Sequence, residues 1–207
     1  MRPTTFLPQI LFLVASVISL KTSAQVNQEL INELDSMVEL DQRWRTAYRE
    51  GVNQSLDSLT KSQLVMTLDA IDSLHYLKLK EMFETYGYLG YDLVGEEGSH
   101  DFWLLMQHQD KHSDFQEAVL EKMAKAVDED QASYTDYAYL LDRVLVNTGK
   151  LQVFGTQMTL NADSTSYIPK PVEDADKLDK RRKKAGLPPM MLYIKIMNER
   201  YFGNLSQ

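Results

Sequence analysis

Apolar residues recur at steps of three and four positions through most of this chain, and this spacing limits the fold more than any other feature of the sequence. It places apolar side chains on one face of an α-helix, where they can pack against a core. In the segment 27–50, which Gly51 ends, the recurring residues are Leu30, Leu34, Met37, Trp44 and Tyr48. The same kind of spacing predicts further helices in the segments 57–86, 115–127 and 133–147.

Shorter segments complete the predicted helical part. The stretch 87–99 is rich in glycine and is predicted to be a loop, because glycine reaches backbone angles that other residues avoid. A helix over 99–109 is expected to follow it, with Ser99 as its N-cap. The last two helices are predicted over 173–185 and from about Pro188 onward.

The segment 151–169 has a strand pattern instead. Its residues alternate in polarity and include many strand formers, and Pro169 and Pro171 are expected to stop the second strand. The predicted architecture is mainly α: a single helical domain over residues 25–207, with about six to seven helices and one small β-hairpin. The chain has no cysteine, so disulfides are excluded, and a domain of this length buries a core without them.

The first 24 residues have the pattern of a secretory signal peptide. Arg2 precedes the apolar run 6–20, and the small residues Thr22, Ser23 and Ala24 follow it. A membrane-spanning helix needs about 20 apolar residues, so we expect cleavage after Ala24 rather than the alternative, an uncleaved anchor. The protein is therefore expected to be exported, periplasmic or secreted, without a permanent membrane anchor.

The chain is acidic, with a net charge of −8 that becomes −10 once Arg2 and Lys21 leave with the signal peptide. Neutralising the phosphates of a nucleic acid requires clustered Lys and Arg residues. The charge balance therefore argues against a nucleic-acid partner.

Three of the four histidines lie in the stretch 99–112, "SHDFWLLMQHQDKH". Wound as a helix, this stretch places His108 and His112 on one stripe. Three interpretations stay open: a metal-binding pair, a catalytic or ligand-binding His108, or a histidine that makes only structural hydrogen bonds. The glutamate of an HExxH motif is missing, and no metal or other cofactor is predicted. His112, near the end of its helix, is expected to act as a favourable cation against the helix dipole.

Polar residues interrupt the apolar pattern of two other helices. Asp41 lies within the apolar stripe of the first helix and either pairs with Arg45, four residues on, or reaches a buried partner. In the helix 133–147, one face carries Asp136, Arg143 and Asn147. Arg143 is suited to bidentate binding of a carboxylate or phosphate, and the alternative is a salt-bridge face within the helix.

The C-terminal part contains a basic run and a polar turn. The run 177–184, "KLDKRRKK", is either an anion-binding patch or the basic end of a helix that begins with acids, and Arg181 or Arg182 is expected to turn inward. Gly155 lies inside a predicted strand, which often marks a bulge or a close approach to a ligand or backbone. Gln157, two residues later, is expected to face inward.

Four segments carry a resemblance: "GYLGYDLVG", "MQHQD", "YLLDRVLVNTGKLQVFGTQ" and "PKPVEDADKLDKRRKKAGLPPM". In this order they resemble a bacterial family catalogued only as a domain of unknown function, over roughly residues 40 to 195. Tyr88-Leu89 stands where that family commonly has Trp-Pro, and Phe154 replaces its usual Tyr. The resemblance implies a shared pocket and these matching polar positions: His108, Asp110, Asp142, Arg143, Gln157, Asp174, Arg181 and Arg182.

Three functional hypotheses follow. In the first, the protein is a binding or interaction module whose pocket holds a small polar or anionic ligand through His108, with the ligand-binding residues Arg143, Gln157, Asp174, Arg181 and Arg182. In the second, it is a hydrolase with His108 as general base and Asp110 or Asp142 as the orienting partner; no G-x-S-x-G motif is present, so water would be the nucleophile. In the third, these residues form only a structural polar network.

Overall fold

The computed structural model describes residues 26–53 and 58–203. The predicted signal peptide, residues 1–24, lies outside this part. No helix within it is both long enough and apolar enough to cross a membrane. The elements follow the chain in the order α1 (Gln28–Asn53), α2 (Ser58–Tyr86), α3 (Tyr91–Met106), α4 (Ser113–Asp128), α5 (Tyr134–Asn147), β1 (Met158–Leu160), β2 (Tyr167–Pro169), the 3₁₀ turn η1 (Ala175–Lys177), α6 (Leu178–Lys184) and α7 (Met190–Phe202).

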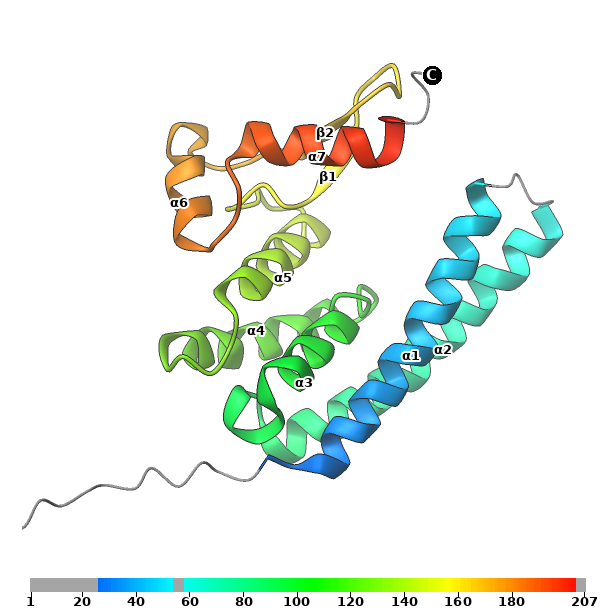
Figure 1. The fold of residues 1–207 in the computed structure, drawn as a ribbon, viewed down its shortest axis with the longest axis vertical. Helices are drawn as coiled ribbons and strands as arrows, with labels where there is room; N and C mark the ends of the chain where they lie inside the picture. Colours follow the sequence, from blue (N-terminus) through cyan, green and yellow to red (C-terminus); the bar gives the residue numbers. More distant parts are fainter. Residues whose placement is uncertain (1–25, 54–57, 204–207) are drawn as a thin grey trace, which may run out of the picture.

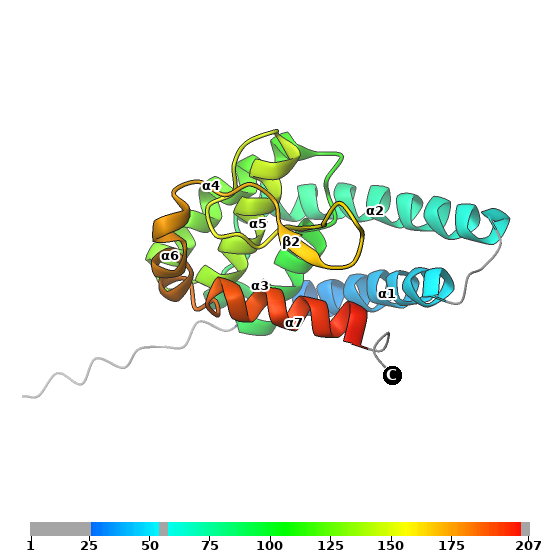
Figure 2. The same cartoon turned by 90° about the horizontal axis from the view of Figure 1, so that it is seen from above.

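Helices α1 and α2 form a long antiparallel pair along one side of the molecule (Figures 1 and 2). α1 begins where the side-chain oxygen of Asn27 accepts hydrogen bonds from the backbone N–H groups of Glu29 and Leu30, each at 3.2 Å. This is the contact by which Asn caps a helix. Leu34 of α1 and Leu79 of α2 are fully buried in the main core. Burying one such leucine contributes about 1.5–3 kcal/mol, so the core stabilises the pair.

Helix α3 occupies the centre of the fold, because it contacts α1, α2 and α5, while α4 packs on α5. Ser133 caps α5 by accepting a hydrogen bond from the backbone N–H of Asp136 at 3.1 Å. The apolar faces predicted from the spacing of the sequence meet in one core. Its fully buried side chains from α3, α4 and α5 are Phe102, Leu105, Met106, Val119, Met123 and Leu140.

The C-terminal elements lie on the opposite side of α5 from α4 (Figure 1). Strands β1 and β2 pair antiparallel, with Thr159 opposite Ile168. Helix α7 packs on β2, where Asn198 exchanges two hydrogen bonds with the backbone of Tyr167, at 2.6 and 3.2 Å. A second, smaller core joins this part to α5; its buried members are Ala138, Phe154, Ala185 and Leu187.

The prediction of a mainly α fold with one small β-hairpin is confirmed, with seven α-helices in the described part. The loop predicted over 87–99 is wrong, because α3 covers most of it and Ser99 lies inside the helix rather than at its N-cap. Gly95 has a φ of 73° and kinks α3. A Cβ on Gly98 would lie 2.9 Å from the Cβ of Val94. Gly95 therefore interrupts the helical backbone at a kink between two helical parts of α3, and Gly98 permits the close approach to Val94.

Two other boundaries differ from the prediction. Helix α3 ends at Met106, so His108 lies in a turn and not on the helix predicted to reach 109. The hairpin is shorter than predicted, because residues 151–157 form a loop and the first strand begins at Met158. Backbone N–H groups of this loop donate hydrogen bonds to the buried carboxylate of Asp142, and an alternating pattern in the sequence does not reveal such a constraint.

Candidate functional site

The turn between α3 and α4, residues 107–112, is bonded to three other helices, α1, α2 and α5. With its carboxamide oxygen facing α5, Gln107 accepts hydrogen bonds from the backbone N–H of Leu140 at 3.1 Å and from the indole N–H of Trp103 at 3.0 Å. Asp110 accepts two hydrogen bonds from Arg143 of α5, both at 2.6 Å. Bonds on both sides hold the residues between them in place.

His108 lies in this turn and is held by Asp41 of α1. The Nδ1 atom of His108 is 3.1 Å from the Oδ1 atom of Asp41, whose side chain is completely buried. Asp41 also accepts hydrogen bonds at 2.8 Å from Arg45 and from Gln42. Arg45 in turn bonds to Asp72 of α2. One buried carboxylate thereby ties α1 to the turn and, through Arg45, to α2.

The protonation of Asp41 determines which ring nitrogen of His108 is free. Burial raises the pKa of Asp41, but the hydrogen bonds and positive charge supplied by His108 and Arg45 outweigh burial and bring this pKa below its ordinary value. An ionised carboxylate only accepts hydrogen bonds, so Nδ1 of His108 is the donor. Nε2 then remains for a ligand, and the carboxylate fixes the orientation of the ring.

His108 lines a cavity of about 210 Å³ beside the 107–112 turn, which we call the turn cavity. Its wall comes from α1, α2, the turn and α5. All of its lining residues are polar: Arg45, Asp69, Asp72, Ser73, His108, Gln109, Asp110, Lys111, His112 and Arg143.

Every cation in this wall already has a carboxylate partner. Arg143 holds Asp110 through two parallel hydrogen bonds, and although burial raises the pKa of Asp110, the bonds and charge of Arg143 bring it below its ordinary value. The pKa of Asp72 is raised, mainly by burial. The ion pairs of the wall are Arg45 with Asp41 and with Asp72, Lys111 with Asp69, and Arg143 with Asp110.

Beside these paired charges, the same region contains polar atoms without partners among the described residues. Gln109 is 1% exposed, and neither its Oε1 nor its Nε2 has a hydrogen-bond partner. The buried His75 lacks a partner for Nδ1, and burial lowers its pKa, which favours the neutral ring. An unsatisfied buried polar group costs about 1–3 kcal/mol of stability. Such atoms beside a cavity therefore indicate a functional role rather than a structural one.

Asp142 does not orient His108 but binds the backbone of the loop 151–157. Asp142 is fully buried, and its two oxygens accept hydrogen bonds from the backbone N–H groups of Val153 at 2.7 Å, Phe154 at 2.9 Å and Thr156 at 2.8 Å. The Thr156 hydroxyl adds a fourth at 3.0 Å. With these donors in place, Asp142 anchors the loop 151–157 to α5. The carboxylate that orients His108 is Asp41, and not Asp110 or Asp142 as the sequence suggested.

The two arginines of the basic run hold the same loop from the other side. Arg182 is fully buried and donates to the backbone oxygens of Phe154 at 2.6 Å and Pro188 at 2.7 Å, which confirms the expected inward turn. Arg181 donates to the oxygen of Val153 at 2.7 Å. The donors of Arg181 are committed to backbone groups, and Arg182 commits its Nε and Nη1 in the same way, whereas the buried Nη2 of Arg182 has no hydrogen-bond partner in the described part of the chain.

The remaining predicted residues, Gln157 and Asp174, also lie outside the turn cavity. The backbone N–H of Gln157 donates to the fully buried Gln152 at 2.9 Å, and Gln157 does not line the turn cavity. Asp174 is exposed and pairs with Lys177 at 3.3 Å. Of the three side chains expected in one pocket, the structure therefore brings together His108 and Arg143 and leaves Gln157 elsewhere.

Two local expectations around the histidines are wrong. His108 and His112 do not share a helical stripe, because α3 ends before both of them. His112 lies at the N-cap position of α4, the wrong end of a helix for a cation, and its ring stacks on Tyr76 with centroids 3.5 Å apart. Of the two alternatives for Arg143, the salt-bridge face within the helix is not found, because Arg143 binds the carboxylate of Asp110 in a bidentate manner and Asp136 bonds to His100 of α3 at 2.9 Å. In the described part, no group of three or more His, Cys, Asp or Glu side chains is arranged to hold a metal ion.

Sequence reasoning missed Gln109 and Asp72, and it left the partner of Asp41 open. The one usable signal was an acid within an apolar stripe. Asp41 in fact satisfies both alternatives, since it bonds to Arg45 and to a partner 67 residues away.

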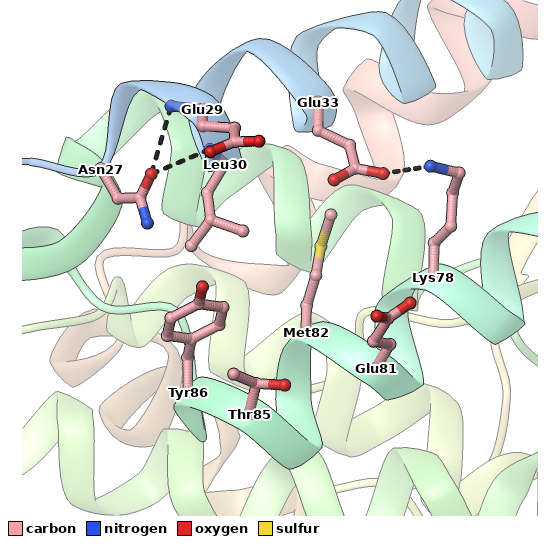
Figure 3. A pocket seen from close by; sticks show the side chains of 9 residues that line it. All are labelled: Asn27, Glu29, Leu30, Glu33, Lys78, Glu81, Met82, Thr85 and Tyr86. Carbon is pink, nitrogen blue, oxygen red and sulfur yellow. Dashed lines mark hydrogen bonds and ion pairs between the residues drawn. The ribbon is translucent and has the colours of Figure 1, made fainter.

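A larger depression, of about 410 Å³, lies between the start of α1 and the end of α2 (Figure 3). Three of its nine lining residues are acidic: Glu29 and Glu81 are exposed, and Glu33 is bonded to Lys78. None of its lining residues is a histidine, and none is a buried polar group lacking a partner in the described part of the chain. Solvated carboxylates on a helix surface are common, so the turn cavity is the better candidate site.

Comparison with family models identifies the class of protein. A family of unknown function, DUF6624, matches residues 28–205, so the chain belongs to this family. Neither the comparison with curated proteins nor the comparison with solved structures gives a match.

Replacing Asp142 by Asn is expected to lower the free energy of unfolding by about 2–4 kcal/mol, because a buried carboxylate with several donors becomes a weaker acceptor. Urea denaturation measures the change, and hydrogen exchange at residues 153–156 should accelerate. The exposed Asp174→Asn variant is the control, with a change within about 0.5 kcal/mol. Equal stability of both variants would contradict the anchoring role.

Replacing Asp41 by Asn is expected to destabilise the protein at neutral pH. Because the pKa of Asp41 is lowered in the folded state, its contribution is present above the ordinary value of 3.8 and disappears as the pH falls through the lowered pKa. The stability difference from the wild type should therefore persist at pH 5 and shrink below about pH 4.

The other Asp–His pair supplies the control for this experiment. Burial raises the pKa of Asp136 above its ordinary value of 3.8, so the folded protein loses stability as the pH rises from this value through the raised pKa. The stability difference between Asp136→Asn and the wild type should therefore change with pH in the opposite direction to that of Asp41→Asn. Urea titrations at several pH values measure both variants. The same slope for both would exclude the assigned charge state of Asp41.

Proposed function

We propose that this protein binds a small polar molecule in the turn cavity, with His108 as the central contact. One observation carries the proposal: His108 lines a cavity while a buried carboxylate occupies its Nδ1 atom, which leaves Nε2 for a ligand. A histidine with only a structural role does not require a cavity beside its ring. The cavity, at about 210 Å³, is smaller than the roughly 300–1,000 Å³ of pockets for drug-sized ligands, which favours a small molecule.

The charge balance favours a neutral or zwitterionic ligand over a simple anion. An anion would have to displace Asp110 from Arg143, or compete with Asp41 and Asp72 for Arg45. Such bidentate and charge-assisted bonds are among the stronger hydrogen bonds in proteins. A neutral polar group can instead bond at the cavity wall without breaking any of these pairs.

Hydrolysis is the second candidate, and the contact between Asp41 and His108 favours it. A carboxylate that fixes the tautomer of a histidine is the usual support for a general base. Ser73 lines the cavity, but its hydroxyl donates to the backbone oxygen of Asp69 at 2.7 Å, so water would be the nucleophile. Turnover of a bound compound, lost in His108→Gln, would distinguish an enzyme from a binding module.

A thermal-shift screen of small polar metabolites, followed by titration of each hit, tests the binding proposal. Compounds that stabilise the wild type should bind His108→Gln at least about tenfold more weakly. His100→Gln is the matched control, because His100 also bonds to an aspartate but lies outside the cavity. Equal loss in both variants, or unchanged binding by His108→Gln, would contradict the proposal.

We also propose that the protein acts outside the cytoplasm, on the pattern of its first 24 residues. Mass spectrometry of the protein isolated from its own cells is then expected to find Gln25 as the first residue. A chain that retains the apolar run 6–20 would contradict cleavage and favour an anchor.

A further inference from the structure

Gln109 has an unusual environment for a buried side chain. Its neighbours His108 and Asp110 are held by α1 and α5, and its own backbone is satisfied: its N–H donates to the oxygen of Met106 at 3.1 Å, and its oxygen accepts from the N–H of His112 at 2.8 Å. Only the carboxamide is left. It is part of a residue that lines the turn cavity and is 1% exposed.

The other buried glutamines have hydrogen-bond partners for their carboxamides, which Gln109 lacks. Gln107 bonds to α5, the amide nitrogen of Gln116 donates to the oxygen of Met106 at 2.8 Å, and Gln152 uses both of its amide atoms on backbone groups. Within the described ranges, Gln109 alone among them has neither carboxamide atom bonded. Buried polar groups nearly always have partners, so a pair without any partner beside a cavity indicates a role in recognition.

The chemistry of the carboxamide restricts what it can recognise. It presents one acceptor and one donor side by side in a plane, and such an edge pairs best with a group that offers a donor beside an acceptor. A primary carboxamide or a lactam has this arrangement, as does the adenine edge that Gln reads in nucleic acids. A carboxylate offers only acceptors and adds a charge that the balanced wall does not need.

We infer that Gln109 is a specificity-determining residue, and that the ligand of the turn cavity carries a neutral amide group, either a primary carboxamide or a lactam. The inference rests on the proposed function and deepens it. On binding, the side chain of Gln109, whose carboxamide atoms are buried in this structure, turns toward the cavity and forms two hydrogen bonds with the amide, while Nε2 of His108 contacts an adjacent polar atom.

Four small probes at millimolar concentration test this inference on the full chain by NMR. Acetamide and 2-pyrrolidinone are expected to shift the side-chain amide signals of Gln109 and the ring signals of His108. N,N-dimethylacetamide has no N–H and acetate has only acceptors, so both should bind at least about tenfold more weakly. Tighter or equal binding of either would overturn the amide assignment, as would the absence of shifts at both residues with all four probes.

Two variants separate recognition from structure. Gln109→Leu should abolish amide binding while keeping or raising the melting temperature, because it removes polar atoms that have no partner in the described structure. Gln107→Leu, which removes a bonded carboxamide of the same turn, should lower the melting temperature. A large loss of melting temperature in Gln109→Leu would overturn the inference and assign a structural role.

The outcomes also distinguish this inference from the proposal it rests on. If Gln109→Leu binds amides as well as the wild type while His108→Gln does not, the inference fails and the binding proposal stands. If neither variant changes the binding of any compound, both fail.

Discussion

The buried carboxylate of Asp41 holds together the parts of this structure that form its candidate site. A charge removed from water is costly unless hydrogen bonds and opposite charge compensate it. Asp41 obtains this compensation from Arg45 and Gln42 of its own helix and from His108, 67 residues further along the chain. Because each bond requires a particular distance and direction, the carboxylate sets the position of the 107–112 turn against α1. The orientation of His108 and the wall of the turn cavity follow from that position.

The same principle operates at the other end of the molecule with different groups. Asp142 and Arg182 are both fully buried, and they bind opposite sides of one loop, the carboxylate through N–H groups and the guanidinium through carbonyl oxygens. This division gives a physical meaning to the polar residues that carry the family resemblance. Asp142, Arg181 and Arg182 hold a loop, whereas His108, Asp110 and Arg143 meet at a cavity.

Local patterns predicted the elements well and their polar contacts poorly. The apolar spacing around Leu34 or Val119 reports which face of a helix is buried, whatever it packs against. The glycines at 95 and 98 were misread as a loop, because a kink with a φ of 73° and a close approach within α3 use the same residue as a turn. The strand pattern at 151–157 failed because Asp142 captures the N–H groups that a strand would have used.

The sequence by itself determined the fold class, the approximate positions of the helices and the hairpin, and the inward turn of one arginine of the pair 181–182. These properties depend on side chains a few positions apart, and the chain order contains that information directly. The tertiary structure alone decided that Asp41, rather than Asp110 or Asp142, orients His108, that Arg143 faces the same cavity while Gln157 does not, and that Gln109 is buried without a partner. Such pairings depend on how whole helices pack, and many arrangements of the same helices would satisfy the same apolar pattern.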